Sequence, residues 1–477
     1  MRDLIKKFST FSIGPIVGAF LGFLTVPIIT HFISAEEYGK SSMFTLAQGA
    51  VSMLIYLGMD QAFVREFHQE KENISRLMSN AIIIPTIFVI ILDTFILIKL
   101  EFISDILFDS SHEYSSVYLM ALMFPFMIIE NFSMLKIRME ERGGLYSFFT
   151  ILLKFFVLLT TIAMFFLYEK SFRSVVYSMA IAEIINGVIL YFVVINQLKL
   201  SIKYFDRNLL SRMLKFGVPL IPASLLGWVL TSMDKIMLRT MCTYSELGLY
   251  TAAFKIVSVL SIVQTCFTLF WTPVAYRWYE ENVSKDRFEM INRLISFVMT
   301  ELCLGLLLLK NIVAWVLGQE FANAIYIFPC ILLYPIMYTI SEATCVGIVF
   351  KRKTYYNILI SGVAGIVNIT LNYMLIPIFY GKGAAIATGI SYMVFFWMRT
   401  IISRCLWIKF PLNRHYIYCG LILLNCGIHT FLSNFSTYIV SAASIIIVIL
   451  MNSNDIIRFI KRILHSRSVR SCNESSK

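Results

Sequence analysis

Seven ionisable side chains occur inside long apolar segments of this 477-residue chain, where a charge is uncommon. They are Lys154, Glu183, Asp234, Lys235, Lys255, Glu301 and Glu342. A charge at the centre of a bilayer costs at least about 2.5–3.5 kcal/mol, so such residues usually face a cavity or a charged partner. Lysine is a strong point-charge partner for phosphate, and a carboxylate can carry a proton or a sodium ion. These residues therefore predict a hydrated cationic cavity for an anionic substrate, with acids available for ion coupling.

The same charges allow a second interpretation, in which they pair with one another and stabilise a bundle of helices. The pair that this interpretation favours is Asp234 with Lys255. Other charges, among them Asp60, Arg65 and Glu130, lie near the ends of apolar segments. There, long side chains can extend to the headgroup region, and these three residues fit that behaviour best.

The apolar segments are long enough to cross a membrane, because about 20 helical residues span the hydrocarbon core. About fourteen such segments follow one another: 11–33, 43–64, 78–99, 115–135, 145–168, 174–196, 214–240, 246–272, 291–309, 323–349, 355–379, 383–403, 415–432 and 436–452. With 58% hydrophobic and 15% charged residues, the composition is that of an integral membrane protein. We therefore predict an all-α membrane protein with about 14 transmembrane helices and no soluble domain.

The basic residues are sorted between alternate gaps. Of the 41 Lys and Arg, 31 lie at the two termini and in every second gap, and seven lie in the opposite gaps. Arg399 is counted here with the basic gap that follows segment 383–403. Because cytoplasmic loops carry an excess of Lys and Arg, both termini are predicted to be cytoplasmic, which an even number of spans requires.

Several classes of function are disfavoured. The net charge of +12 could suggest nucleic-acid binding, but the basic residues flank apolar segments, where they orient the protein and contact anionic lipid headgroups. The chain has no GxxxxGK[ST], GxSxG or HExxH motif, so nothing points to ATP hydrolysis or to a hydrolytic enzyme. The six histidines and nine cysteines have no metal-ligand spacing. No cofactor, metal or nucleic acid is expected.

An imperfect internal echo suggests two halves. Residues 32–43 and 241–253 each place a Glu two residues before a Gly, as Glu37 with Gly39 and as Glu246 with Gly248. The offset of 209 residues corresponds to six spans, which is typical of transporters built from two similar lobes. The predicted organisation is an N-terminal lobe (1–205), a C-terminal lobe (206–410), two additional spans (411–455) and a basic cytoplasmic tail (456–477).

The chain resembles the Wzx-type polysaccharide flippases, in the superfamily that also contains multidrug MATE exporters and lipid II flippases. The resemblance rests on these blocks: FLTVPIITHFISAEEYGKSSM (23–43), LGMDQAFVRE (57–66), FGVPLIPASLLGWVLTSMDKIMLR (216–239), SELGLYTAAFKIVSVL (245–260), WTPVAYRWY (271–279) and GKGAAIATGISY (381–392). It implies a MATE-like pair of six-helix lobes plus two C-terminal helices, working by alternating access. The implied substrate is an undecaprenyl-pyrophosphate-linked oligosaccharide, moved across a bacterial plasma membrane for O-antigen, capsule, exopolysaccharide or teichoic-type polysaccharide synthesis.

The resemblance also implies that Asp60, Arg65, Asp234, Lys235 and Lys255 line the cavity. The cost of placing a charge in a membrane adds three more candidates, Lys154, Glu183 and Glu301. In the full set, the basic residues are candidates for substrate binding and the acidic residues are candidates for ion coupling. The candidate substrate-binding residues are Arg65, Lys154, Lys235 and Lys255, and the candidate ion-coupling residues are Asp60, Glu183, Asp234 and Glu301. Transport would draw on a proton or sodium gradient or on mass action, with a glycan polymerase and glycosyltransferases as functional neighbours.

Three alternatives remain open. A lipid II flippase would share the chemistry and differ only in the sugar. A MATE-type drug exporter would share the fold but should favour anionic cavity residues, against which Lys154, Lys235 and Lys255 argue. A polysaccharide polymerase would be an enzyme with a large outer catalytic loop, and the predicted outer loops are short.

Overall fold

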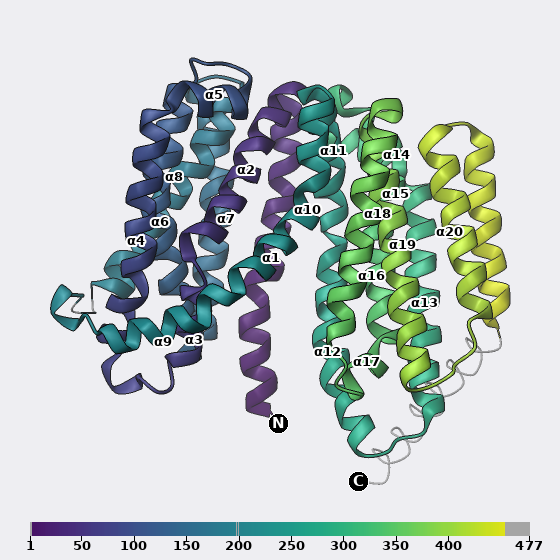
Figure 1. Ribbon diagram of the computed structural model, residues 1–477. Helices are drawn as coiled ribbons and strands as arrows, with labels where there is room; N and C mark the ends of the chain where they lie inside the picture. Colours follow the sequence, from purple (N-terminus) through teal and green to yellow (C-terminus); the bar gives the residue numbers. More distant parts are fainter. Residues whose placement is uncertain (1, 197, 199, 454–477) are drawn as a thin grey trace, which may run out of the picture. The chain divides into compact units, whose positions relative to one another are not determined.

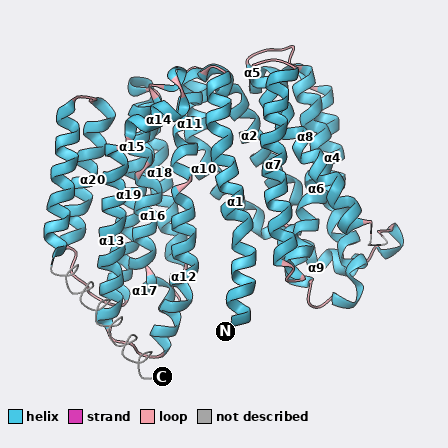
Figure 2. Cartoon of the chain, turned by 180° about the vertical axis from the view of Figure 1, so that it is seen from behind, coloured by secondary structure: helices cyan, strands magenta, loops and turns pink. Residues whose placement is uncertain are grey.

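The structure is a computed structural model that describes residues 2–196, 198 and 200–453, and every regular element in these residues is helical (Figures 1 and 2). The all-α prediction is confirmed. The predicted tail at 456–477 lies outside the described residues.

Eleven described helices are long and apolar enough to cross a membrane. A twelfth span results if α2 (Ala35–Tyr56) and α3 (Met59–Glu66), which meet at a bend of 50°, are counted together. The bend falls at Leu57 and Gly58, both of which have positive φ. Two further expected segments are helical, as α10 (Ile221–Met241) and α20 (Asn413–Phe431), but neither is among the membrane-capable helices. The count of fourteen is therefore not confirmed.

The chain forms two compact units, and the first contains residues 1–259 with two short later segments, 315–322 and 376–381. Besides α2, α3 and α10, its helices are α1 (Arg2–Phe32), α4 (Ile74–Ile98), α5 (Leu100–Phe108), α6 (Tyr114–Met139), α7 (Gly143–Leu167), α8 (Phe172–Leu190), α9 (Arg207–Gly217) and α11 (Tyr244–Ser258). Its largest core cluster is rich in Phe and Met, including the buried Phe63, Phe124 and Phe132. Dispersion contacts among such side chains hold helices together where lipid is as apolar as the core.

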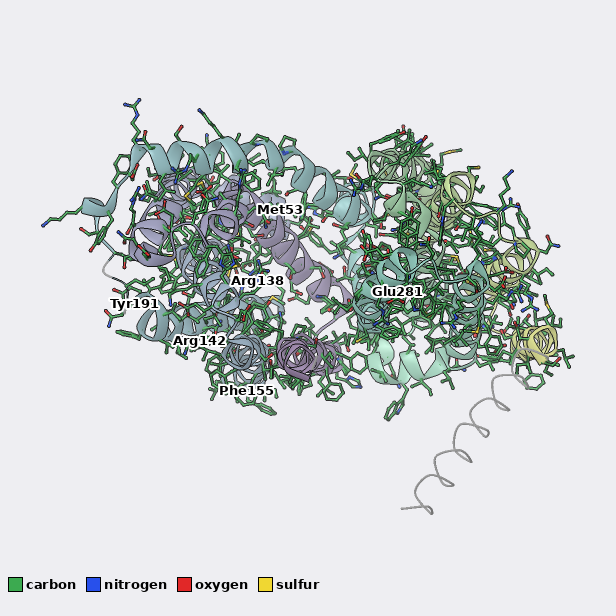
Figure 3. All side chains as sticks on the ribbon, turned by 90° about the horizontal axis from the view of Figure 1, so that it is seen from below. Met53, Arg138, Arg142, Phe155, Tyr191 and Glu281 are labelled. Carbon is green, nitrogen blue, oxygen red and sulfur yellow. The ribbon has the colours of Figure 1, made fainter. Side chains whose placement is uncertain are left out.

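Successive long helices of the first unit alternate in direction (Figure 1). The start of α1 and the basic turns after α3, α6 and α8 therefore lie at one end of this unit. Figure 3 views that end, with Arg138 and Arg142 labelled beside the α6–α7 turn. Part of the charge there is paired, as in the contact of Lys136 with Glu140 at 2.7 Å and that of Arg212 with Glu70 at 3.1 Å.

The second unit comprises the rest of the described chain after residue 259. Its helices are α12 (Leu260–Glu280), α13 (Lys285–Leu308), most of α14 (Lys310–Leu317), α15 (Ala324–Ile331), α16 (Leu333–Thr344), α17 (Val346–Phe350), most of α18 (Tyr355–Phe379), α19 (Gly381–Leu406) apart from its first residue, α20 and a last helix, Phe435–Ser453. One aromatic cluster joins several of them: the ring of Trp407 lies 4.8 Å from that of Phe288 and 4.7 Å from that of Phe350.

A polar seam connects α20 to the helix Phe435–Ser453. We use this name for Asn425 and His429 on α20 together with Ser441 and Ser444 on the last helix. Asn425 donates to Ser444 Oγ at 2.9 Å and accepts from Ser441 at 2.8 Å, and His429 Nε2 lies 2.8 Å from Ser441 Oγ. All four side chains are buried, so these hydrogen bonds replace contacts that the polar groups would otherwise make with water.

The sequence echo corresponds to equivalent local structure. Ser34 and Thr243, 209 residues apart, cap α2 and α11, and each accepts a hydrogen bond from the backbone N–H of the following Glu, Glu37 or Glu246. Each Glu then caps another helix: Glu37 accepts from Phe172 N–H at the start of α8, and Glu246 from Gly381 N–H at the start of α19. These two cap partners are also 209 residues apart, so the repeat extends to long-range contacts.

Candidate functional site

Lysines from three helices of the first unit form the candidate site. Lys154 lies on α7, Lys235 on α10 and Lys255 on α11. Among charged groups, Lys235 and Lys154 act most strongly on the Lys255 ammonium, and both repel it. The side chain of Lys255 is exposed on α11. We call these three residues the lysine cluster.

Close packing of α1 against α7 positions Lys154. The backbone N–H of Gly14 donates to Ser147 Oγ at 2.9 Å, and a Cβ on Gly18 would lie 3.5 Å from Lys154 Cγ. Ser147 and Lys154 are two turns apart and share one face of α7. The small residues of α1 thus allow this face of α7 to pack closely against α1. The next residue after Lys154, Phe155, is 46% exposed (Figure 3).

Aromatic side chains and Asp234 surround Lys235. Its ammonium lies 5.3 Å from the centre of the Phe254 ring, a cation–π distance, and Asp234 attracts it electrostatically. The buried carboxylate of Asp234 accepts a hydrogen bond from Tyr250 Oη at 2.8 Å. Asp234 therefore interacts with Lys235, whereas the charged groups that act on Lys255 are the other two lysines.

A group of acids adjoins Lys154 on the other side. Glu130 on α6 and Glu183 on α8 interact directly, and Lys154 attracts Glu130. Asn186 is fully buried and also interacts with Glu130. Lys154 is thus the residue that links these acids to the other lysines.

The position of Glu130 corrects the expectation that it extends to the headgroups. Segment 115–135 was predicted to end close to it, but α6 continues to Met139, which leaves Glu130 well inside the helix. The signal for the later end is the pair Lys136 and Arg138, which occupies the last turn.

The other predicted residues belong to α3 and α13. The Arg65 guanidinium on α3 lies 4.4 Å above the Phe216 ring and is exposed. Asp60, at the start of α3, accepts a hydrogen bond from Gln61 at 2.9 Å and acts electrostatically on Tyr56 together with Glu130 and Glu183. Glu301 belongs to α13 in the second unit, where its Oε1 is buried without a hydrogen-bond partner.

The ion pair between Arg399 and Glu342 was not predicted from the sequence. Arg399, counted as a flanking charge, lies inside α19 and is 9% exposed. Its Nη1 contacts Glu342 Oε1 on α16 at 2.7 Å and donates to Ser341 Oγ at 2.8 Å. Glu342 was recognised as an intramembrane charge, and the need of a buried carboxylate for a partner is the signal that could have identified Arg399.

Among the described residues, no group of three or more His, Cys, Asp and Glu side chains is arranged to hold a metal ion. The chemistry that the lysine cluster offers is binding, because concentrated positive charge within a membrane attracts an anion such as a phosphate.

Solved structures with the same fold are membrane transporters and flippases. The chain is similar to the lipid II flippase MurJ in an inward closed conformation, with a TM-score of 0.68 and 16% identity over 94% of this chain and 99% of that one. It is also similar to an inward-facing multidrug resistance MATE transporter, with a TM-score of 0.63 and 14% identity over 81% of this chain and 94% of that one. A third similar structure is a MOP superfamily transporter from Pyrococcus furiosus with a binding pocket of reverse polarity, with a TM-score of 0.53 and 14% identity over 84% of this chain and 95% of that one.

The fold is therefore that of the MurJ and MATE transporters. The family model described as polysaccharide biosynthesis protein matches residues 4–278, more than half of the chain, and the chain belongs to this family. No curated protein sequence matches it significantly.

Proposed function

We propose that this chain is a flippase for an undecaprenyl-pyrophosphate-linked oligosaccharide in the bacterial plasma membrane. The observation that carries the proposal is the lysine cluster, which concentrates positive charge among three helices of a member of the polysaccharide biosynthesis family. The lipid tail can remain in the bilayer while the pyrophosphate and sugars cross through a polar path. Residues 1–205 and 206–410 would act as two lobes in alternating access, with 411–455 as an addition.

In this proposal, Lys154, Lys235 and Lys255 bind the pyrophosphate. Arg65, at the end of the first unit that holds the basic turns, would receive it there. Asp60, Glu183, Asp234 and Glu301 are the proposed carriers of a coupled proton or sodium ion. A glycan polymerase and glycosyltransferases would act before or after transport, and both termini would be cytoplasmic.

Lipid II is the second candidate substrate, because the chain is similar in fold to the lipid II flippase MurJ. The two candidates share a pyrophosphate and differ in the sugar, so the lysine cluster suits both. A drug cation is less suitable, because lysines repel it.

Replacement of each lysine by alanine tests the proposal. A charge-assisted contact contributes about 1.5–3 kcal/mol, so Lys235→Ala and Lys255→Ala should weaken substrate binding roughly ten- to hundredfold and reduce surface polysaccharide. Protein levels should stay normal, and Lys→Arg should retain much of the activity. Lys170→Ala is a matched control, because Lys170 is exposed in the α7–α8 turn.

Normal export by both alanine variants at normal protein level would refute the role of the cluster. The structural alternative has a different signature. If Lys255 serves only to neutralise Asp234, the single variants lose stability, and the double variant Lys255→Ala/Asp234→Asn recovers both protein level and export.

A further inference from the structure

Aromatic rings and the Glu342–Arg399 pair form a continuous row between α16 and α19 of the second unit. On α16, Tyr334, Tyr338 and Glu342 follow at intervals of four residues, and on α19 the row continues with Tyr392, Phe395 and Arg399. Such spacing places each set on one helix face. We call these six residues the aromatic ladder.

The rungs of the ladder are side-chain pairs across the two helices. The rings of Tyr334 and Tyr392 lie 4.6 Å apart, and those of Tyr338 and Phe395 lie 5.7 Å apart at an interplanar angle of 13°. The next rung is the ion pair between Glu342 and Arg399. Successive rungs are about one helical turn, or roughly 5.4 Å, apart, which is close to the length of one pyranose unit.

The ladder retains binding capacity that the fold does not use. Its four rings and Glu342 are all partly exposed rather than buried. The Arg399 guanidinium lies 5.4 Å from the Tyr338 ring centre and 5.1 Å from that of Phe395, yet its buried Nε has no hydrogen-bond partner. A buried donor without an acceptor is unfavourable, so a ligand oxygen that enters beside this N–H would remove that cost.

The charge of the ladder selects the class of ligand. Glu342 and Arg399 cancel, so the row attracts neither a phosphate nor a drug cation by net charge, unlike the lysine cluster. The electron-rich ring faces favour C–H groups, and the ion pair offers both donors and acceptors to hydroxyl groups. A neutral molecule with C–H faces and hydroxyl edges satisfies both requirements, and a sugar is such a molecule.

We propose that the aromatic ladder binds the sugar units of the transported lipid, with rings stacked on pyranose faces and Arg399 and Glu342 hydrogen-bonded to hydroxyls. This inference rests on the proposed function and assigns the recognition of the glycan to the second unit. In the same scheme, the lysine cluster binds the pyrophosphate irrespective of the sugar.

Binding of two lipids to the purified full-length protein in nanodiscs tests the proposal. One probe is undecaprenyl pyrophosphate without sugar, and the other is the undecaprenyl-pyrophosphate-linked oligosaccharide extracted from cells that express the protein. Tyr338→Leu keeps apolar bulk but removes a stacking face, and should weaken binding of the sugar-bearing probe about three- to tenfold. Binding of the bare pyrophosphate should not change.

The matched control is Tyr279→Leu, because Tyr279 stacks on Phe350 at 4.2 Å in the same unit but outside the ladder. Unchanged binding of both probes by Tyr338→Leu would overturn the ladder proposal, as would equal weakening of both or the same selective loss in Tyr279→Leu. A wild-type protein that binds neither probe would instead overturn the proposed function itself. Arg399 is left unaltered in this test because its loss would leave the largely buried Glu342 carboxylate without its positively charged partner.

Discussion

Gly39 on α2 and Gly248 on α11 each lie against the backbone of the other's helix. A Cβ on Gly39 would be 2.0 Å from the carbonyl oxygen of Tyr244, and one on Gly248 would be 1.8 Å from that of Ala35. Both pairs of positions, 35 with 244 and 39 with 248, differ by 209. The contact between α2 and α11 is therefore reciprocal, because equivalent positions of the two repeats contact each other. The repeated Glu and Gly residues of the sequence lie at this contact. Small residues permit this backbone approach in membrane helices.

The first prediction concerns this crossing. Gly39→Ala and Gly248→Ala should each destabilise the protein by about 1–3 kcal/mol or more, because a backbone carbonyl cannot move aside for the added methyl group. The thermal unfolding temperature of the protein in detergent measures the effect. Gly22→Ala is the control, since nothing lies within 4 Å of a Cβ at that position. Equal stability of the Gly39 and Gly22 variants would contradict the reciprocal contact.

The two equivalent caps give a second prediction. Glu37→Ala and Glu246→Ala should lower stability by similar amounts, about 1.5–3 kcal/mol, because each removes a charged acceptor from the start of a distant helix. The N–H of Gly381 lies 2.9 Å from Glu246 Oε2. Glu36→Ala serves for comparison, since the exposed Glu36 pairs with Lys40 at 3.0 Å and such surface pairs contribute about 0–1 kcal/mol. An equally large loss of stability in Glu36→Ala would contradict the capping role of Glu37 and Glu246.

Lys310 provides a third prediction. This lysine is fully buried, and its ammonium donates to the backbone carbonyls of His429 at 3.1 Å and Leu432 at 3.0 Å. Lys310→Met should destabilise the protein by about 1–3 kcal/mol although it removes a buried charge, because these acceptors lose their donor. Lys382→Met is the matched control, since the ammonium groups of Lys310 and Lys382 both lie over the Tyr326 ring. Chemical unfolding that ranks Lys382→Met as the more damaging change would speak against the capping role.

The fourth prediction is the orientation in the membrane. In a background without the native cysteines, a membrane-impermeant thiol reagent applied to intact cells should label His112→Cys but not Phe205→Cys. The reason is the division of basic residues, 31 against seven, between the two sets of gaps. Both positions are exposed, so accessibility within the fold does not confound the comparison. Labelling at 205 would reverse the topology.

Hydropathy predicted the helices because a membrane leaves the backbone few alternatives to internal hydrogen bonds. It could not predict the bend at Leu57 and Gly58, which depends on local backbone conformation. Segment ends were also imprecise, and for that reason Glu130 and Arg399 were assigned to helix ends although both lie inside helices.

The candidate site was only partly predictable. The cost of charge identified Lys154, Lys235 and Lys255 one by one, but their proximity depends on how α7, α10 and α11 pack. That packing is decided by contacts such as Gly14 with Ser147, which a single sequence does not reveal. The aromatic ladder was missed for the same reason, because Tyr and Phe at helical spacing are ordinary in a membrane helix until the opposite helix is known.

The polar seam bears on how the chain is inserted during synthesis. Taken alone, α20 is not among the helices apolar enough to enter a bilayer, and its Asn425 and His429 bond to side chains of the helix that follows. Lipid cannot form the hydrogen bonds that water forms with these groups, so α20 should remain at the translocon until the helix Phe435–Ser453 has been synthesised. The two helices would then enter the bilayer together as a hairpin, and a nascent chain stopped near residue 432 would leave α20 outside the membrane.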